Sequence, residues 1–315
     1  MASVATHEVL IGGVVAAQPR GRAGFIGAVR SEFTKIRSVR STYWTLFALV
    51  VVCAGFGALI CWARAEQIVR VGQVGGPGFR VRVQGGGGPP DAAQLSQAKA
   101  ALRATVRASA ANISLVGLLI GQLIIVVLGA LTITSEYSTG MIRTSLSTMP
   151  RRGTVYAAKA VVFGAVALVT GLITSFLTFF IGQAILSSQQ AGTSLGQPDV
   201  LRTVVGGGLF LAVCGLLSFG LGAILRHTAG AISAGIGLLF VVYILGNFLP
   251  GPPAGWYGAA DVDKWLPFNA GAAIWARPGM LETNPFSPWI GFGVFCAYAA
   301  AAIGVGLILF RKRDA

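Results

Sequence analysis

The chain has 315 residues, of which 54% are hydrophobic and only 11% are charged, and its mean hydropathy is +0.74. This composition lies far from that of soluble globular domains and predicts residence in a membrane. The formal charge of +14 would suit nucleic-acid binding, but the basic residues flank apolar stretches, where lipid headgroups and the positive-inside rule account for them. We therefore expect no nucleic-acid partner.

The N-terminal region divides into two parts. Residues 1–20 are predicted to be disordered, and residues 21–43 form an amphipathic helix that lies in the headgroup plane. Its apolar positions recur at three- and four-residue steps, at Ile26, Val29, Phe33, Ile36 and Tyr43. Basic residues interleave, and Glu32 is the one acid among them. The pattern fits a plain membrane anchor and a partner-binding helix equally, so an exposed partner contact at Glu32 stays open.

Six apolar stretches are long enough to cross a hydrocarbon core about 30 Å thick, so we predict an all-α membrane protein with six transmembrane helices. They cover residues 44–62, 113–134, 160–186, 203–225, 229–249 and 289–310 of a transmembrane domain over residues 44–310, followed by a basic tail at 311–315. Small residues four positions apart permit close helix contacts, as at Gly117 and Gly121, Gly171 and Ser175, and Ala302 and Gly306.

Six spans place both termini on one side of the membrane. That side carries 14 Lys and Arg residues and the opposite side 10, of which seven lie in the long loop 63–112. Long loops count little in the positive-inside rule, so both termini are predicted to be cytoplasmic, with the basic outer loop as the contrary observation.

The two outer loops differ in composition. Loop 63–112 holds a Gly-rich run at 72–90, which predicts a flexible linker, and then an Ala-rich helix over 92–111. Loop 250–288 is rich in Pro, Gly and aromatic residues. It reads either as an interfacial aromatic belt or, as its length favours, as a partly re-entrant cap over an outer exit. Its two acids, Asp261 and Asp263, are too few for a calcium site.

The sequence offers no catalytic constellation. No Lys follows a Gly, so the phosphate-binding pattern GxxxxGK[ST] does not occur. The four Cys residues lie in or beside apolar spans without a CxxC pair, and no predicted span has an Asp, Glu, Lys, Arg or His in its interior. We expect no enzyme activity, no metal site and no cofactor in this chain. If ATP drives the protein, another chain binds it.

The segment between the second and third spans carries the most specific pattern. Ser135 is predicted to cap a short helix that holds Glu136 near its positive end, and Pro150 ends that helix. Met141, Ile142 and Leu146 would form an apolar ridge that suits docking into a groove on a cytoplasmic partner.

This segment, together with the N-terminal helix, resembles the ABC-2 type permease family, the membrane subunits of ATP-binding-cassette exporters. The resemblance rests on a run E-Y-x-x-G-x-x-R, then P-R-R and a Lys, after an amphipathic E-x-x-K helix. The matching residues are Glu136, Tyr137, Gly140, Arg143, Pro150, Arg151 and Lys159, preceded by Glu32, Lys35 and Arg37. The resemblance implies a six-helix, type V exporter fold in a bacterial inner membrane. Residues 21–43 would be the connecting helix and the segment from Glu136 the coupling helix, both meeting a cytoplasmic ATPase dimer that binds ATP and Mg.

The resemblance also implies a second permease copy or paralogue, with the second and fifth spans lining the transport pathway. On those spans Gln122, Tyr243 and Asn247 are candidate cavity residues, although interhelical hydrogen bonds would explain them as well. Drugs, antibiotics, lipids, peptides and sodium all remain possible cargo. A non-transporting scaffold that recruits a cytoplasmic partner is the alternative function.

Overall fold

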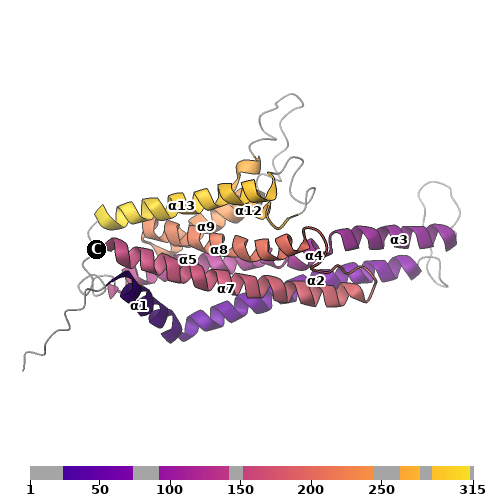
Figure 1. Ribbon diagram of the computed structural model, residues 1–315, viewed down its shortest axis with the longest axis horizontal. Helices are drawn as coiled ribbons and strands as arrows, with labels where there is room; N and C mark the ends of the chain where they lie inside the picture. Colours follow the sequence, from indigo (N-terminus) through magenta and orange to yellow (C-terminus); the bar gives the residue numbers. More distant parts are fainter. Residues whose placement is uncertain (1–23, 74–91, 142–151, 245–262, 277–285, 313–315) are drawn as a thin grey trace, which may run out of the picture.

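The computed structural model describes residues 24–73, 92–141, 152–244, 263–276 and 286–312, and within these ranges the chain is helical without strands. Five stretches are long and apolar enough to cross a membrane. They are α2 (Arg40–Gln73), α4 and α5 together (Ala110–Leu115 and Leu118–Ser138), α7 (Arg152–Ser187), α8 (Val200–Leu225) and α13 (Pro288–Lys312). They run side by side as an elongated bundle (Figure 1). The predicted all-α membrane fold is confirmed.

The fifth predicted span, 229–249, is described only in part. Helix α9 (Thr228–Ile236) passes into a π-helix, η1 (Gly237–Val241), and the helical stretch reaches Ile244. Residues 245–249 lie outside the described ranges. The count of six spans therefore stays a prediction.

Helix α8 forms the centre of the bundle and packs against α5, α7 and α13. Its sequence is apolar all round, as expected of a helix enclosed by others. Glycine allows its backbone to approach its neighbours: a Cβ atom at Gly171 of α7 would lie 2.6 Å from the Gly208 carbonyl oxygen of α8. The side chain of Ser175, one turn further, donates a hydrogen bond of 2.5 Å to the Val204 carbonyl oxygen. Ala302 and Gly306 of α13 likewise approach Gly220 of α8.

The described part of the loop before α13 folds back into the protein. Helix α12 (Pro267–Ala272) and the turn after it are buried against α13, α8 and η1. Asn112 donates a hydrogen bond of 2.5 Å to the Trp275 carbonyl oxygen, and Arg202 donates one of 2.6 Å to that of Ile274. Residues 267–276 are therefore enclosed by other helices, which favours the predicted re-entrant segment over an interfacial belt, while most of the remaining loop 250–288 lies outside the described ranges.

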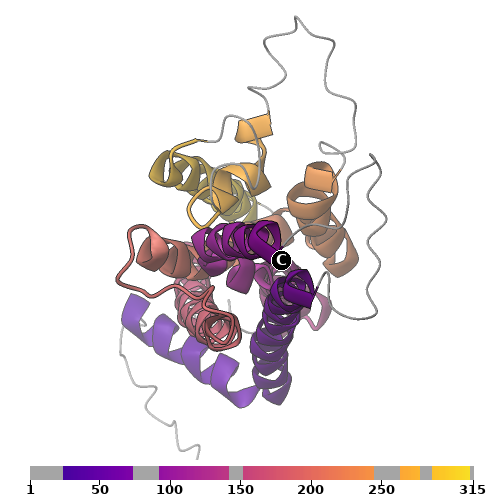
Figure 2. The ribbon, with the colours of Figure 1, turned by 90° about the vertical axis from the view of Figure 1, so that its right-hand side faces the viewer.

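The N-terminal helices differ from the predicted boundaries. Helix α1 (Phe25–Ser38) ends at Val39, whose backbone is extended, and α2 starts at Arg40. Figure 2 shows α1 lying across one end of the bundle. Helix α2 continues past residue 62, the predicted end of the first span, and packs against α3 (Ala92–Ala108). The buried residues Cys61, Ile68 and Val106 belong to a second apolar cluster there. Most of the predicted Gly-rich linker lies outside the described ranges.

The contact between α7 and α8 predicts a difference between two glycines. Gly171→Ala should destabilise the protein by about 1–3 kcal/mol, because the new methyl group overlaps the backbone of α8. Gly304→Ala is the control, because a Cβ atom there meets nothing within 4 Å. Thermal unfolding of the purified chain in detergent measures both. Equal midpoints for the two variants would contradict the close α7–α8 packing.

Candidate functional site: a buried ion cluster

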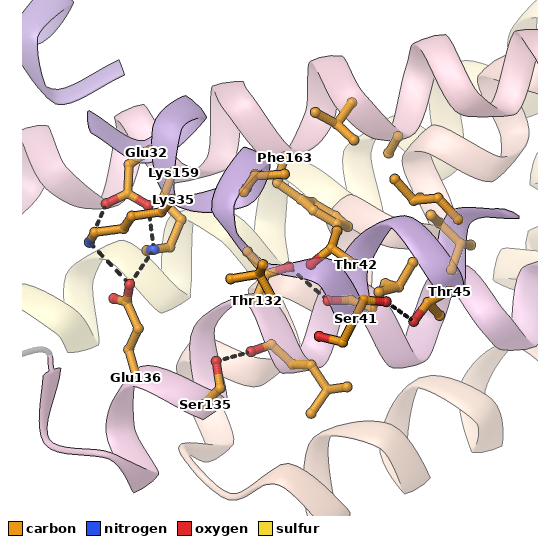
Figure 3. Close-up of a pocket in the computed structure, with 18 of the residues that line it drawn as sticks. Glu32, Lys35, Ser41, Thr42, Thr45, Thr132, Ser135, Glu136, Lys159 and Phe163 are labelled. Atoms are coloured by element: carbon orange, nitrogen blue, oxygen red, sulfur yellow. Dashed lines mark hydrogen bonds and ion pairs between the residues drawn. The ribbon is translucent and has the colours of Figure 1, made fainter. Parts of the chain in front are cut away.

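Four charged side chains from three helices meet at one end of the bundle. Glu32 and Lys35 lie three residues apart on α1, Glu136 lies in the last turn of α5, and Lys159 lies near the start of α7. Figure 3 shows these side chains pointing toward one another beside a cavity. We call this group the ion cluster.

The distances in the ion cluster form a closed ring of alternating charge. Lys159 Nζ lies 2.6 Å from Glu32 Oε2 and 2.7 Å from Glu136 Oε1. Lys35 Nζ lies 2.9 Å from Glu32 Oε1 and 3.3 Å from Glu136 Oε1. Each ammonium group thus bridges both carboxylates, and the formal charges cancel. Such charge-assisted contacts are short and directional.

Burial makes this arrangement sensitive to the loss of any member. Glu32, Glu136 and Lys159 are only 4%, 7% and 6% exposed, whereas the side chain of Lys35 is 32% exposed. Removing a charge from water costs several kcal/mol per ion, and a closed set of partners offsets that cost. The ion cluster therefore specifies how α1, α5 and α7 sit together more than it adds net stability.

The pKa values on α1 reflect a balance of burial and pairing. Burial alone would raise the pKa of Glu32, but the ammonium groups of Lys159 and Lys35 outweigh it and hold that pKa below its ordinary value of 4.5. Burial alone would lower the pKa of Lys35, but the carboxylates of Glu32 and Glu136 outweigh it and raise that pKa above 10.5. Both groups stay charged at neutral pH.

The comparison with known families decides what kind of membrane protein this is. The family model for ABC-2 family transporter proteins matches residues 29–315, which include all four members of the ion cluster. This chain belongs to the ABC-2 transporter family. Members of the family are membrane components that generally work with an ATPase subunit. A comparison with curated proteins finds no match for the chain.

One prediction about the ABC-2 motif segment is wrong, and one open alternative for the N-terminal helix is now closed. Ser135 does not cap a new helix, because α5 continues through it to Ser138 and its hydroxyl donates to the Leu131 carbonyl oxygen at 2.6 Å. Glu136 therefore lies at the negative end of a helix, an unfavourable place that the two lysines compensate. Glu32 is not an exposed contact either, because it is buried between α1 and α7.

The other motif residues have different surroundings. The guanidinium carbon of Arg226 lies 4.9 Å from the centroid of the Tyr137 ring. The Tyr137 ring also packs edge-on against Phe310. Gly140 follows α5 with φ of +69°, a left-handed conformation that favours glycine. Arg37 is exposed on α1. Arg143, Pro150 and Arg151 lie outside the described ranges, as do Ile142 and Leu146 of the predicted ridge, while Met141 is exposed.

A cavity of about 400 Å³ lies beside the ion cluster, between α1, α2, α5 and α7. Its walls carry the hydroxyl groups of Thr45 and Thr132, each of which donates to the carbonyl oxygen four residues earlier in its own helix (Figure 3). The sequence pattern did not predict this cavity. Its one local signal is the group of Ser and Thr residues at the start of α2 and the end of α5.

Two of the three predicted pathway residues lie in the described part of the chain. Gln122 is fully buried in α5, and neither its amide nitrogen nor its amide oxygen has a hydrogen-bond partner among the described residues. The ring of Tyr243 packs on Phe268 of α12 with centroids 4.3 Å apart. Asn247 lies outside the described ranges.

The unequal burial of the two lysines predicts unequal effects of their removal. Lys159→Met should destabilise the protein by about 3–5 kcal/mol, because it leaves two buried carboxylates short of a partner. Lys35→Met should cost less, since water reaches that position. Lys312→Met at the exposed end of α13 is the control. Denaturant unfolding in detergent measures all three, and equal losses for Lys159→Met and Lys35→Met would refute the closed buried ring.

The pKa directions predict that α1 stays docked over a wide pH range. The lowered pKa of Glu32 gives stabilisation that is present above its unfolded value and lost as pH falls through the folded value. The raised pKa of Lys35 gives stabilisation that is present below its unfolded value and lost as pH rises through the folded value. Docking should therefore be constant between about pH 5.5 and pH 9.5.

Nitroxide labels at Ser31→Cys on α1 and Ile173→Cys on α7, both exposed positions, report this docking as a distance distribution. The distribution should broaden only outside that pH range. Release of α1 near pH 7 would show that the charges are not paired as described.

Proposed function

We propose that this chain is the permease subunit of an ABC exporter, which moves substrate across the membrane with ATP hydrolysed by a separate cytoplasmic ATPase. The observation that carries the proposal is the ion cluster. It joins α1 to the end of α5 and the start of α7, which are the segments that the motif resemblance assigns to contact with the ATPase. ATP and Mg belong to the partner chain in this proposal.

The packing suggests how a displacement at the ATPase would reach the pathway. Helices α5 and α7 both pack along α8, and the ion cluster ties α1 to them. A push on α1 or on the α5–α7 connection would therefore move these helices as one unit, while α8 carries the motion toward α13 and α12. We infer a second permease copy or paralogue across the pathway, a bacterial inner membrane, and termini on the cytoplasmic side.

Gln122 supports a pathway along α5. An unpaired buried amide costs about 1–3 kcal/mol, and a conformation that opens α5 to water or to cargo would remove that cost. The π-helical turn η1, in the fifth predicted span, also supports a pathway here, because π-turns often occur at functional positions. We retain Tyr243 and Asn247, which belong to the same predicted span, as pathway candidates. Multidrug or antibiotic efflux is one cargo class among several.

Recruitment without transport remains the second candidate function. The same ion cluster would hold α1 in place for a partner that hydrolyses no nucleotide. The two functions differ in whether ATP hydrolysis depends on the charge of Glu136.

The proposal predicts that Glu136→Gln uncouples the complex. The change keeps the size of the side chain and removes the charge that both lysines bind, so transport and substrate-stimulated ATP hydrolysis should fall about 5- to 150-fold. Glu66→Gln, which alters an exposed pair with Arg70 at the far end of α2, is the matched control. The assay uses the permease reconstituted in vesicles with its ATPase. Unchanged assembly, transport and hydrolysis in Glu136→Gln would overturn the assignment.

A further inference from the structure

A groove with a volume of about 680 Å³ runs between α1 and α7 on the outside of the described part of the bundle. Its walls are almost wholly apolar. Val29 and Phe33 contribute from α1, and the α7 wall consists of residues between Val161 and Thr170, mostly valine and alanine. These short side chains leave a channel, and Phe33, Val161 and Val169 are exposed beside it.

One charge lines this groove. Arg30 of α1 is its only ionisable residue, and the Arg30 guanidinium makes no ion pair or hydrogen bond within the part of the chain that is described. No carboxylate lines the groove to neutralise it. An unpaired guanidinium beside an apolar channel favours a ligand that carries an anionic group at one end.

The direction of the groove follows from the ion cluster. Glu32 fastens α1 to Lys159, and the α7 wall begins two residues later, at Val161. From there the groove runs away from the charged end of the bundle toward Thr170. Arg30 lies two residues before Glu32 on α1, so we place it among the headgroups at the charged end, with the apolar wall running into the hydrocarbon.

The length of the groove matches one leaflet. The nine steps from Val161 to Thr170 cover roughly 13.5 Å at 1.5 Å per residue. Half of a hydrocarbon core about 30 Å thick is roughly 15 Å. An acyl chain of the leaflet at the α1 end would thus lie along the whole groove without reaching the second leaflet.

We propose that the groove between α1 and α7 is a binding site for one anionic phospholipid, with its phosphate on the Arg30 guanidinium and one acyl chain along Val161–Thr170. The lipid would hold α1 on a side that the ion cluster does not contact. Helix α1 is then fixed both by protein charges and by the membrane. The site needs no ATPase, so its test is independent of the proposed transport function.

Native mass spectrometry of the full chain in detergent, titrated with phosphatidylglycerol or phosphatidylcholine, tests the site. The wild-type chain should prefer phosphatidylglycerol, and Arg30→Gln should bind it about tenfold more weakly, because a charge-assisted contact is lost. Arg30→Lys should keep most of the preference. Arg37→Gln, an exposed residue of the same helix outside the groove, should bind like wild type.

A second pair of variants tests the α7 wall along which the acyl chain would lie. Ala165→Phe fills the groove at an exposed position of α7 and should weaken binding of both lipids, whereas Ala300→Phe, exposed on α13, should not. Equal binding by Arg30→Gln and Arg37→Gln, or no effect of Ala165→Phe, would overturn the proposal. So would a change from dimer to monomer in Ala165→Phe, because the groove would then hold a second copy of the chain.

Discussion

The position of α1 depends on one electrostatic constraint, the burial of two carboxylates and two ammonium groups in a single ring. Helix α1 buries only Ala28 and Glu32, so little apolar contact fixes it. Its attachment comes from Glu32 to Lys159, 127 residues away, and from Lys35 to Glu136, 101 residues away. Because a buried ion without its partners is costly, the three helices are stable together in one arrangement. These ion pairs thereby make α1 part of the bundle.

The packing of the other helices connects the ion cluster to the rest of the bundle. Helix α8 lies between α5, α7 and α13, and glycine at its contacts brings the backbones close together. Close-packed cores shift as units because side chains have few alternative positions. Helices α5 and α7, which carry Glu136 and Lys159, are thus the ones that contact α8, and α8 in turn contacts the buried helix α12. A groove for a lipid beside α1 would add the membrane as a second support.

The sequence predicted the parts of this arrangement better than their assembly. Bilayer thickness demands long apolar stretches, so hydropathy located five spans, and the family motif singled out Glu32, Lys35, Glu136 and Lys159. Hydropathy marks where a helix leaves the hydrocarbon and not where it ends. Helix α5 therefore ran past its apolar stretch to Ser138, and the cap predicted at Ser135 was wrong. Pairing across more than a hundred residues has no local signal, so the sequence did not predict that the four residues assigned to ATPase contact bind one another.

A double-mutant cycle on Glu32→Gln and Lys159→Met tests the central claim most directly, with denaturant unfolding of the purified chain as the measurement. The ring predicts that the two changes are strongly non-additive, with an interaction energy of about 1–3 kcal/mol. The same cycle on Glu66→Gln and Arg70→Met, an exposed pair 3.9 Å apart, should give about 0–0.5 kcal/mol. An interaction energy between Glu32 and Lys159 no larger than that of the exposed pair would contradict the account.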